Sequence, residues 1–161
     1  MGEPVTKERL LRYVYLQMEY YNNIDRLARL ENSTQLPAMQ QSDGSQRSLL
    51  KASRMERAAD RKMDQEKKIR AKIARLVEEM DEIEDAVDNL PDPMQKEVLR
   101  LRYLDCDESE DYESCKHMKW GDVAKKIYGS DDEKYKMAIW RIHGHALQEL
   151  LEQERKENEQ A

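Results

Sequence analysis

The stretch "LPDPMQKEVLRLRYLD", residues 90–105, interrupts a long charged helical pattern with two prolines and then begins an apolar one. Pro91 cannot extend a straight helix, because it lacks an N–H group and its ring clashes with the preceding turn. Asp92 is a favourable N-cap residue, and Pro93 suits the first helical position. Gln95 stands where the partner residue of a capping box reaches back to the cap. The stretch therefore predicts the end of one helix and the start of another.

The composition on either side of this stretch predicts helices with narrow apolar faces. Of the 161 residues, 39% are hydrophobic and 39% are charged, and only five are glycine and four proline. Such a polar chain suits long, largely solvated helices, so we expect an all-α fold. No apolar run is long enough to cross a membrane, and the N-terminus lacks the apolar core of a signal peptide. We therefore expect a cytoplasmic protein that does not bind membranes.

The region before the prolines, residues 1–89, is expected to form a long helical hairpin or coiled coil. Helical spacing predicts one helix over residues 6–31 and another over 49–89, joined by a flexible polar linker over 32–48. A heptad seam runs along the second helix, and its residues are Ile69, Ile73, Leu76, Met80, Ile83 and Val87. The partner of this seam is either the first helix folded back, which we favour, or a second copy of the chain in a homodimer.

The second long helix carries a step in charge along its length. Residues 51–75 contain ten Lys and Arg against four Asp and Glu, whereas residues 76–89 contain seven acids and no base. A solvated helix with many salt bridges accounts for this pattern. The alternative is that the basic half lies near an acidic partner or a nucleic acid.

The region after the prolines, residues 90–161, is expected to be a three-helix unit with a helix-turn-helix. The stretch "MKWGDVAKKIYGS", residues 118–130, predicts a short helix and a glycine-containing turn before a long final helix. Ser130 or Asp131 can cap that final helix. A small residue in the short helix lets the two helices approach closely, while branched residues fill the space between them. The expected core residues are Ala124, Ile127, Ile139 and Ile142.

Three motifs of this region resemble a known family. "LPDPMQKEVLRLRYLD", "WGDVAKKI" and "IWRIHGHALQELL" are similar to the C-terminal, region 4 type helix-turn-helix with which bacterial sigma factors read promoter DNA. More narrowly, they resemble small phage-encoded sigma-like transcription regulators related to the ArpU-type late-transcription regulators. The resemblance covers residues 90–151. It implies specific binding of double-stranded DNA in a bacterial host cell, with host RNA polymerase as a further partner.

Helix geometry selects the candidate contact residues of this module. If Ile139 and Ile142 face inward, the opposite side of the final helix is free to meet the edges of bases in the major groove. The expected base-reading residues are Lys136, Met137, Trp140 and Arg141. Other lysines would neutralise phosphates and set the register, and these are Lys119, Lys125, Lys126 and Lys134. In the helix that begins at the proline pair, Lys96, Arg100 and Arg102 are able to face water.

The charge of the module leaves a second hypothesis open. Residues 90–161 carry 17 acids and 12 bases, a net charge of −5, whereas a DNA-reading domain is typically basic. Residues 105–117 are strongly acidic and longer than the connection usual in the family. These features favour a protein-interaction adaptor that keeps the sigma-like module and binds RNA polymerase or another regulator without DNA. A phage packaging subunit is a third hypothesis, although such proteins usually place the DNA-binding module first.

The sequence contains no pattern typical of an enzyme, a metal site or a cofactor site. It has no glycine-rich phosphate loop and no nucleophile–base set at credible spacing. Cys106 and Cys115, with His117, offer three zinc ligands, but their spacing fits no common zinc site. The acidic loop does not match a calcium-binding loop, because Glu110 stands where an EF-hand needs glycine. We therefore expect no catalysis, metal or cofactor.

Overall fold

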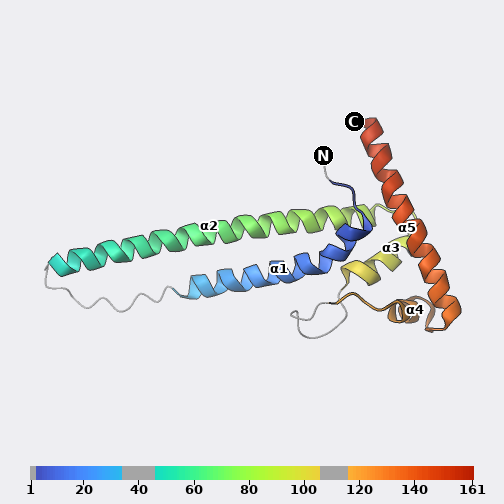
Figure 1. Ribbon diagram of the computed structural model, residues 1–161, viewed down its shortest axis with the longest axis horizontal. Coiled ribbons are helices and arrows are strands. Elements are labelled where there is room, and N and C mark those ends of the chain that lie inside the picture. Colours follow the sequence, from blue (N-terminus) through green and yellow to red (C-terminus); the bar gives the residue numbers. More distant parts are fainter. Residues whose placement is uncertain (1–2, 34–45, 106–115) are drawn as a thin grey trace. The chain divides into compact units, whose positions relative to one another are not determined.

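The computed structural model describes residues 3–33, 46–105 and 116–161, and all regular structure in these ranges is helical (Figure 1). The helices are α1 (Lys7–Asn32), α2 (Gln46–Asp88), α3 (Pro93–Leu99), α4 (Trp120–Tyr128) and α5 (Glu133–Gln160), and a π-helical turn, η1 (Arg100–Leu104), continues α3. The predicted all-α fold class is confirmed. Within the described ranges, none of the helices has the length and apolar character needed to span a membrane.

The chain forms two compact units whose limits differ from the expected boundary at residues 89 and 90. Unit 1 comprises Met1–Glu19 and Val77–Ala161, and unit 2 comprises Tyr20–Leu76. The C-terminal part of α2, residues 77–88, belongs to unit 1, and residues far along the chain contact its end. Asp88 accepts a hydrogen bond from Arg100 at 2.6 Å, and the Asn89 carbonyl accepts one from Gln153 Nε2 at 3.1 Å.

The helix start at the proline pair follows the predicted cap chemistry in part. The Asp92 carboxylate accepts a hydrogen bond from the Met94 N–H at 2.8 Å, and Pro93 opens α3. The predicted N-cap is therefore confirmed. The predicted capping box is wrong, because Gln95 Oε1 is buried without a hydrogen-bond partner among the described residues. One local contact is enough to start this helix.

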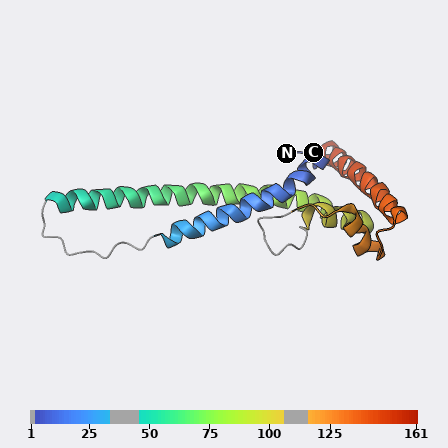
Figure 2. The same cartoon turned by 60° about the horizontal axis from the view of Figure 1, so that its bottom comes forward.

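Contacts between α1 and α2 occur in both units. In unit 1 the pairs Arg9–Glu82, at 2.9 Å, and Arg12–Glu79, at 3.6 Å, show that the two helices run antiparallel. In unit 2, Glu31 of α1 pairs with Arg70 of α2 at 2.9 Å. Along the predicted seam, Leu76, Ile83 and Val87 are buried, and Ile69, Ile73 and Met80 are half-buried. Both views show α2 as one uninterrupted helix (Figures 1 and 2).

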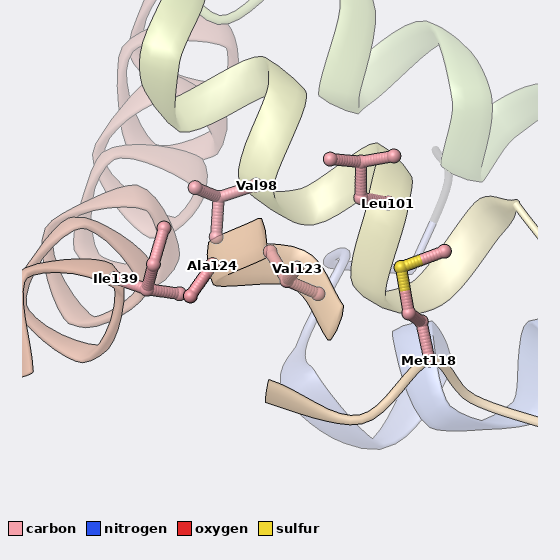
Figure 3. Close-up of a cluster of buried hydrophobic side chains, with 6 residues drawn as sticks. All are labelled: Val98, Leu101, Met118, Val123, Ala124 and Ile139. Carbon is pink, nitrogen blue, oxygen red and sulfur yellow. The ribbon is translucent and has the colours of Figure 1, made fainter. Parts of the chain in front are cut away.

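The core formed by the C-terminal helices of unit 1 is a cluster of buried apolar side chains (Figure 3). Its members come from α3, η1, the segment before α4, α4 itself and α5, and they are Val98, Leu101, Met118, Val123, Ala124 and Ile139. Burial of each large apolar side chain stabilises the fold by about 1.5–3 kcal/mol before opposing entropy is counted. In both views α5 passes α3 and α4, which lie on one side of it (Figures 1 and 2).

Candidate nucleic-acid interface

A tight turn joins α4 to α5 and sets the position of the candidate recognition helix. Gly129 has φ +76°, in the left-handed region, and its N–H donates to the Lys125 carbonyl at 2.8 Å. Glycine adopts this conformation without the steric cost that a Cβ atom brings. The N-cap of α5 is Asp132, so the prediction of Ser130 or Asp131 was wrong by at least one residue. The Asp132 N–H instead donates to Ser130 Oγ at 3.3 Å within the turn.

The residues expected to pack between α4 and α5 lie at that junction. Ala124 and Ile139 are fully buried, and Ile127 and Ile142 are half-buried against the same cluster. A small side chain at Ala124 leaves room for α5 to pack closely. These contacts fix which side of α5 faces the protein and which side faces outward.

The outward side of the first half of α5 carries three of the four expected base-reading residues. Met137 is 54% exposed and Trp140 is 61% exposed, and Arg141 is also exposed. Lys136 lies at the edge of this side. A Cβ atom added to Gly121 would meet Lys136 Cε at 3.5 Å, so the lysine chain lies beside the start of α4. Its ammonium group is 3.9 Å from Glu133.

The expected phosphate-binding lysines are all exposed, but they differ in their surroundings. Lys119 occupies the N-cap position of α4. Lys125 pairs with Asp131 at 3.5 Å, and the Lys134 ammonium lies 4.8 Å from the centre of the Tyr135 ring. Lys126 is exposed near the end of α4. Interactions of exposed ion pairs are typically worth less than about 1 kcal/mol, so they leave these cations able to bind phosphate.

An aromatic cluster that the sequence analysis did not predict supports this side of α5. The Trp120 ring meets His143 edge-on at 4.8 Å and Trp140 at 6.4 Å between ring centres. The Arg102 guanidinium lies 4.5 Å above the Trp120 ring, and Arg102 also donates to the Met118 carbonyl. Arg102, which the sequence left able to face water, is therefore half-buried and packs on this ring. A cation over an indole ring is stabilising, and it brings an arginine from η1 against α4.

A buried hydrogen bond ties η1 to the middle of α5. Tyr103 Oη and His143 Nε2 are 2.7 Å apart. Burial, with the nearby charges of Lys7 and Arg102, lowers the pKa of His143 to about 4. Burial also raises the pKa of Tyr103 above its ordinary value. Both groups are therefore neutral at pH 7, and their hydrogen bond positions α5 without adding charge beneath it.

The candidate metal residues do not form a site in the described part of the chain. Cys106, Cys115 and Glu110 lie outside the described residues. Burial, followed by the charge of Arg102, lowers the pKa of His117. Across residues 3–33, 46–105 and 116–161, no group of three or more His, Cys, Asp or Glu side chains is arranged to hold a metal ion.

Comparison with known proteins finds no match: no family model, curated protein or solved structure is significantly similar to the chain.

Proposed function

We propose that the protein binds duplex DNA through α5 and regulates transcription in a phage or prophage, as its C-terminal motifs suggest. The observation that supports this proposal best is the two-sided first half of α5. Ile139 is fully buried, while Met137 and Trp140 on the other side are more than half exposed. A helix-turn-helix uses a helix presented in this way to enter the major groove.

The side chains on the outward face suit the groove chemically. The major groove is about 12 Å wide and accepts an α-helix. The Arg141 guanidinium can donate two hydrogen bonds to O6 and N7 of one guanine, and the apolar surface of Met137 or Trp140 can contact a thymine methyl group. Lys119, Lys125 and Lys126 would bind phosphates on either side and set the orientation, because phosphate contacts position a protein without specifying sequence.

The proposal is tested by selection of binding sites from a pool of random duplexes with the full-length chain. We expect the wild type to enrich a defined sequence. The double variant Trp140→Ala/Arg141→Ala should lose that enrichment, with preference over random duplex falling by about ten- to a hundred-fold, since a good bidentate contact contributes about 1–3 kcal/mol of discrimination.

A matched control uses the same helix. Leu151→Ala/Arg155→Ala also removes one exposed apolar side chain and one arginine from α5, at positions closer to the C-terminus. We expect this control to retain selectivity. Equal enrichment by the wild type and the Trp140/Arg141 double variant would show that the outward side of α5 does not read bases.

A protein-interaction adaptor is the second candidate function, because unit 1 is acidic. Unit 1 contains 15 Lys and Arg against 27 Asp and Glu, a net charge of −12. Such a charge opposes binding to phosphate, whereas exposed Trp140 and Met137 suit a protein partner. The adaptor is supported if the chain binds bacterial RNA polymerase without DNA, if Trp140→Ala weakens that binding, and if no duplex is enriched at low salt.

A further inference from the structure

The exposed ring of Trp140 is in contact with a second indole that the fold holds in place. Trp140 is 61% exposed, yet its ring lies edge-on to the ring of Trp120, with 6.4 Å between the ring centres and 67° between the planes. Trp120 opens α4 and is half-buried against the core cluster. One side of the Trp140 ring therefore rests on the protein, while the rest of the ring is open to a partner.

The Trp120 ring is itself held on two sides. The guanidinium carbon of Arg102 lies 4.5 Å from its centre, and the ring of His143 meets it edge-on at 4.8 Å. His143 Nε2 is 2.7 Å from Tyr103 Oη, and Tyr103 is only 1% exposed. The contacts therefore lead from an exposed ring to a buried side chain of η1. We call Arg102, Tyr103, Trp120 and His143 the brace.

The local geometry of α4 and α5 explains why these rings meet. Residues three apart lie side by side on a helix, so Trp140 and His143 present one surface to Trp120. The start of α4 also lies close to α5. A Cβ atom added to Gly121 would already be in van der Waals contact with Lys136 Cε, at 3.5 Å. The brace thus follows from how closely the two helices approach.

Met137, the other apolar side chain on the outward side of α5, differs from Trp140 in its freedom. Met137 is 54% exposed, and methionine is an unbranched side chain with three rotatable bonds. Ordering a flexible side chain at an interface opposes binding, whereas a side chain that is already ordered in the free protein avoids that loss. The braced Trp140 ring is therefore better suited than Met137 to contact a small apolar group at a fixed place.

We propose that Trp120 is a positioning residue, which holds the Trp140 ring so that the ring contacts the C5 methyl group of one thymine in the major groove. The thymine methyl is the apolar group that base pairs present in this groove. The inference rests on the function proposed for α5, and it names a base that α5 reads and the residue that reads it.

The first test needs no DNA and measures the order of the Trp140 ring in the full-length chain. The chain has two tryptophans, so the Trp140→Ala variant assigns the two indole N–H signals in ¹⁵N relaxation spectra. We expect an order parameter for the Trp140 indole of about 0.85 in the wild type and below about 0.6 in Trp120→Leu. Trp120→Phe keeps an aromatic edge and should retain most of the order. A mobile ring in the wild type, or an equally ordered ring in Trp120→Leu, overturns the proposal.

The second test uses the duplex that the wild type enriches, with each thymine replaced in turn by deoxyuridine, which lacks only the methyl group. At one position the affinity of the wild type should fall about three- to five-fold, the contribution of one buried methyl group. This ratio should be about one in Trp140→Ala and unchanged in Met137→Ala. In Trp120→Leu the ratio should fall below about two, and the affinity for the thymine duplex should fall roughly two- to ten-fold, because the ring must then be ordered on binding.

Val123→Ala is the matched control, because it weakens α4 and leaves the brace intact. Val123 is fully buried in the core cluster. We expect Val123→Ala to keep the ring order and the thymine-to-uracil ratio of the wild type. The ratio compares two duplexes on the same protein, so a smaller folded fraction cancels in it. If Val123→Ala and Trp120→Leu reduce the order and the ratio alike, Trp120 has only a structural role and the proposal is wrong.

The outcomes also separate this proposal from the function proposed for α5. If a sequence is enriched but no uracil substitution changes the affinity, or if the change persists in Trp140→Ala, α5 reads DNA and only the role of Trp120 and Trp140 at thymine is wrong. Loss of the methyl effect in Met137→Ala would assign the thymine to Met137 and has the same meaning. If no sequence is enriched, the function proposed for α5 fails, and the reading of thymine fails with it.

Discussion

Gly129 and Gly144 provide a paired test of the turn before α5, because replacement by alanine should have opposite effects at the two positions. Gly129 has φ +76°, and a Cβ atom added there meets nothing within 4 Å, so the backbone conformation is the only source of strain. The left-handed conformation costs an alanine roughly 1–2 kcal/mol. The reduced freedom of the unfolded chain offsets about 0.4–1 kcal/mol of this cost. Gly129→Ala should therefore lower the free energy of unfolding by about 1 kcal/mol.

Gly144 lies within α5, is exposed, and also has nothing within 4 Å of an added Cβ atom. Alanine is favoured over glycine inside a helix by about 0.8–1 kcal/mol. Gly144→Ala should therefore raise the free energy of unfolding by that amount. The two variants should differ by about 2 kcal/mol, although the chemical change is identical.

The measurement is urea unfolding followed by tryptophan fluorescence. Trp120 and Trp140 are the two tryptophans of the chain, and both lie in unit 1, so the signal reports on the unit that contains the turn. With a slope of about 2 kcal/mol per molar urea, the midpoint should fall by roughly 0.5 M for Gly129→Ala and rise by a similar amount for Gly144→Ala. A neutral or stabilising Gly129→Ala would refute the left-handed turn, and a destabilising Gly144→Ala would refute an open surface there.

The same assay tests three other features. Ile139→Ala should lower the free energy of unfolding by about 2–4 kcal/mol, because it removes buried apolar surface. The exposed control Leu151→Ala should change the free energy of unfolding by less than about 0.5 kcal/mol. Similar losses in the two variants would refute the assignment of Ile139 to the core. The pKa of His143 is about 4 in the folded chain, compared with an ordinary value of 6.5 for an unfolded chain. Between these two pH values the unfolded chain binds more protons than the folded chain, so the free energy of unfolding falls as the pH decreases from 6.5 towards 4. His143→Gln should reduce this loss by roughly 1–2 kcal/mol, a figure lowered for the partial exposure of the ring, and an unchanged pH profile would contradict a buried neutral histidine. Asp92→Ala should lower the free energy of unfolding by about 0.5–2 kcal/mol, and Asp92→Asn should lower it much less, because asparagine is also a favourable N-cap residue. Equal losses in the two variants would argue against Asp92 as the N-cap of α3.

Features that depend on neighbours in the sequence were predicted well. The proline pair with Asp92 predicted where α3 begins, and the spacing of apolar residues predicted helices at residues 6–31 and 49–89, close to the observed Lys7–Asn32 and Gln46–Asp88. These features are visible in a sequence because a cap, a proline and a helical repeat act over only a few residues.

Features that depend on distant residues required the folded chain. The hydrogen bond between Tyr103 and His143 joins positions 40 residues apart, and the contact of Gln153 with Asn89 joins positions 64 apart. Such contacts draw Arg102 onto Trp120 and place the end of α2 in unit 1.

The charge step along α2 was visible in the sequence, but the folded chain was needed to show which carboxylates are already paired. A chain this rich in both charges offers many possible ion pairs, and only the packing of α1 against α2 selects Arg9 for Glu82 and Arg12 for Glu79. Sequence by itself therefore determined the helices and their apolar faces, because those follow from local geometry. The tertiary structure alone decided which side of α5 remains exposed, because exposure depends on every helix packed nearby.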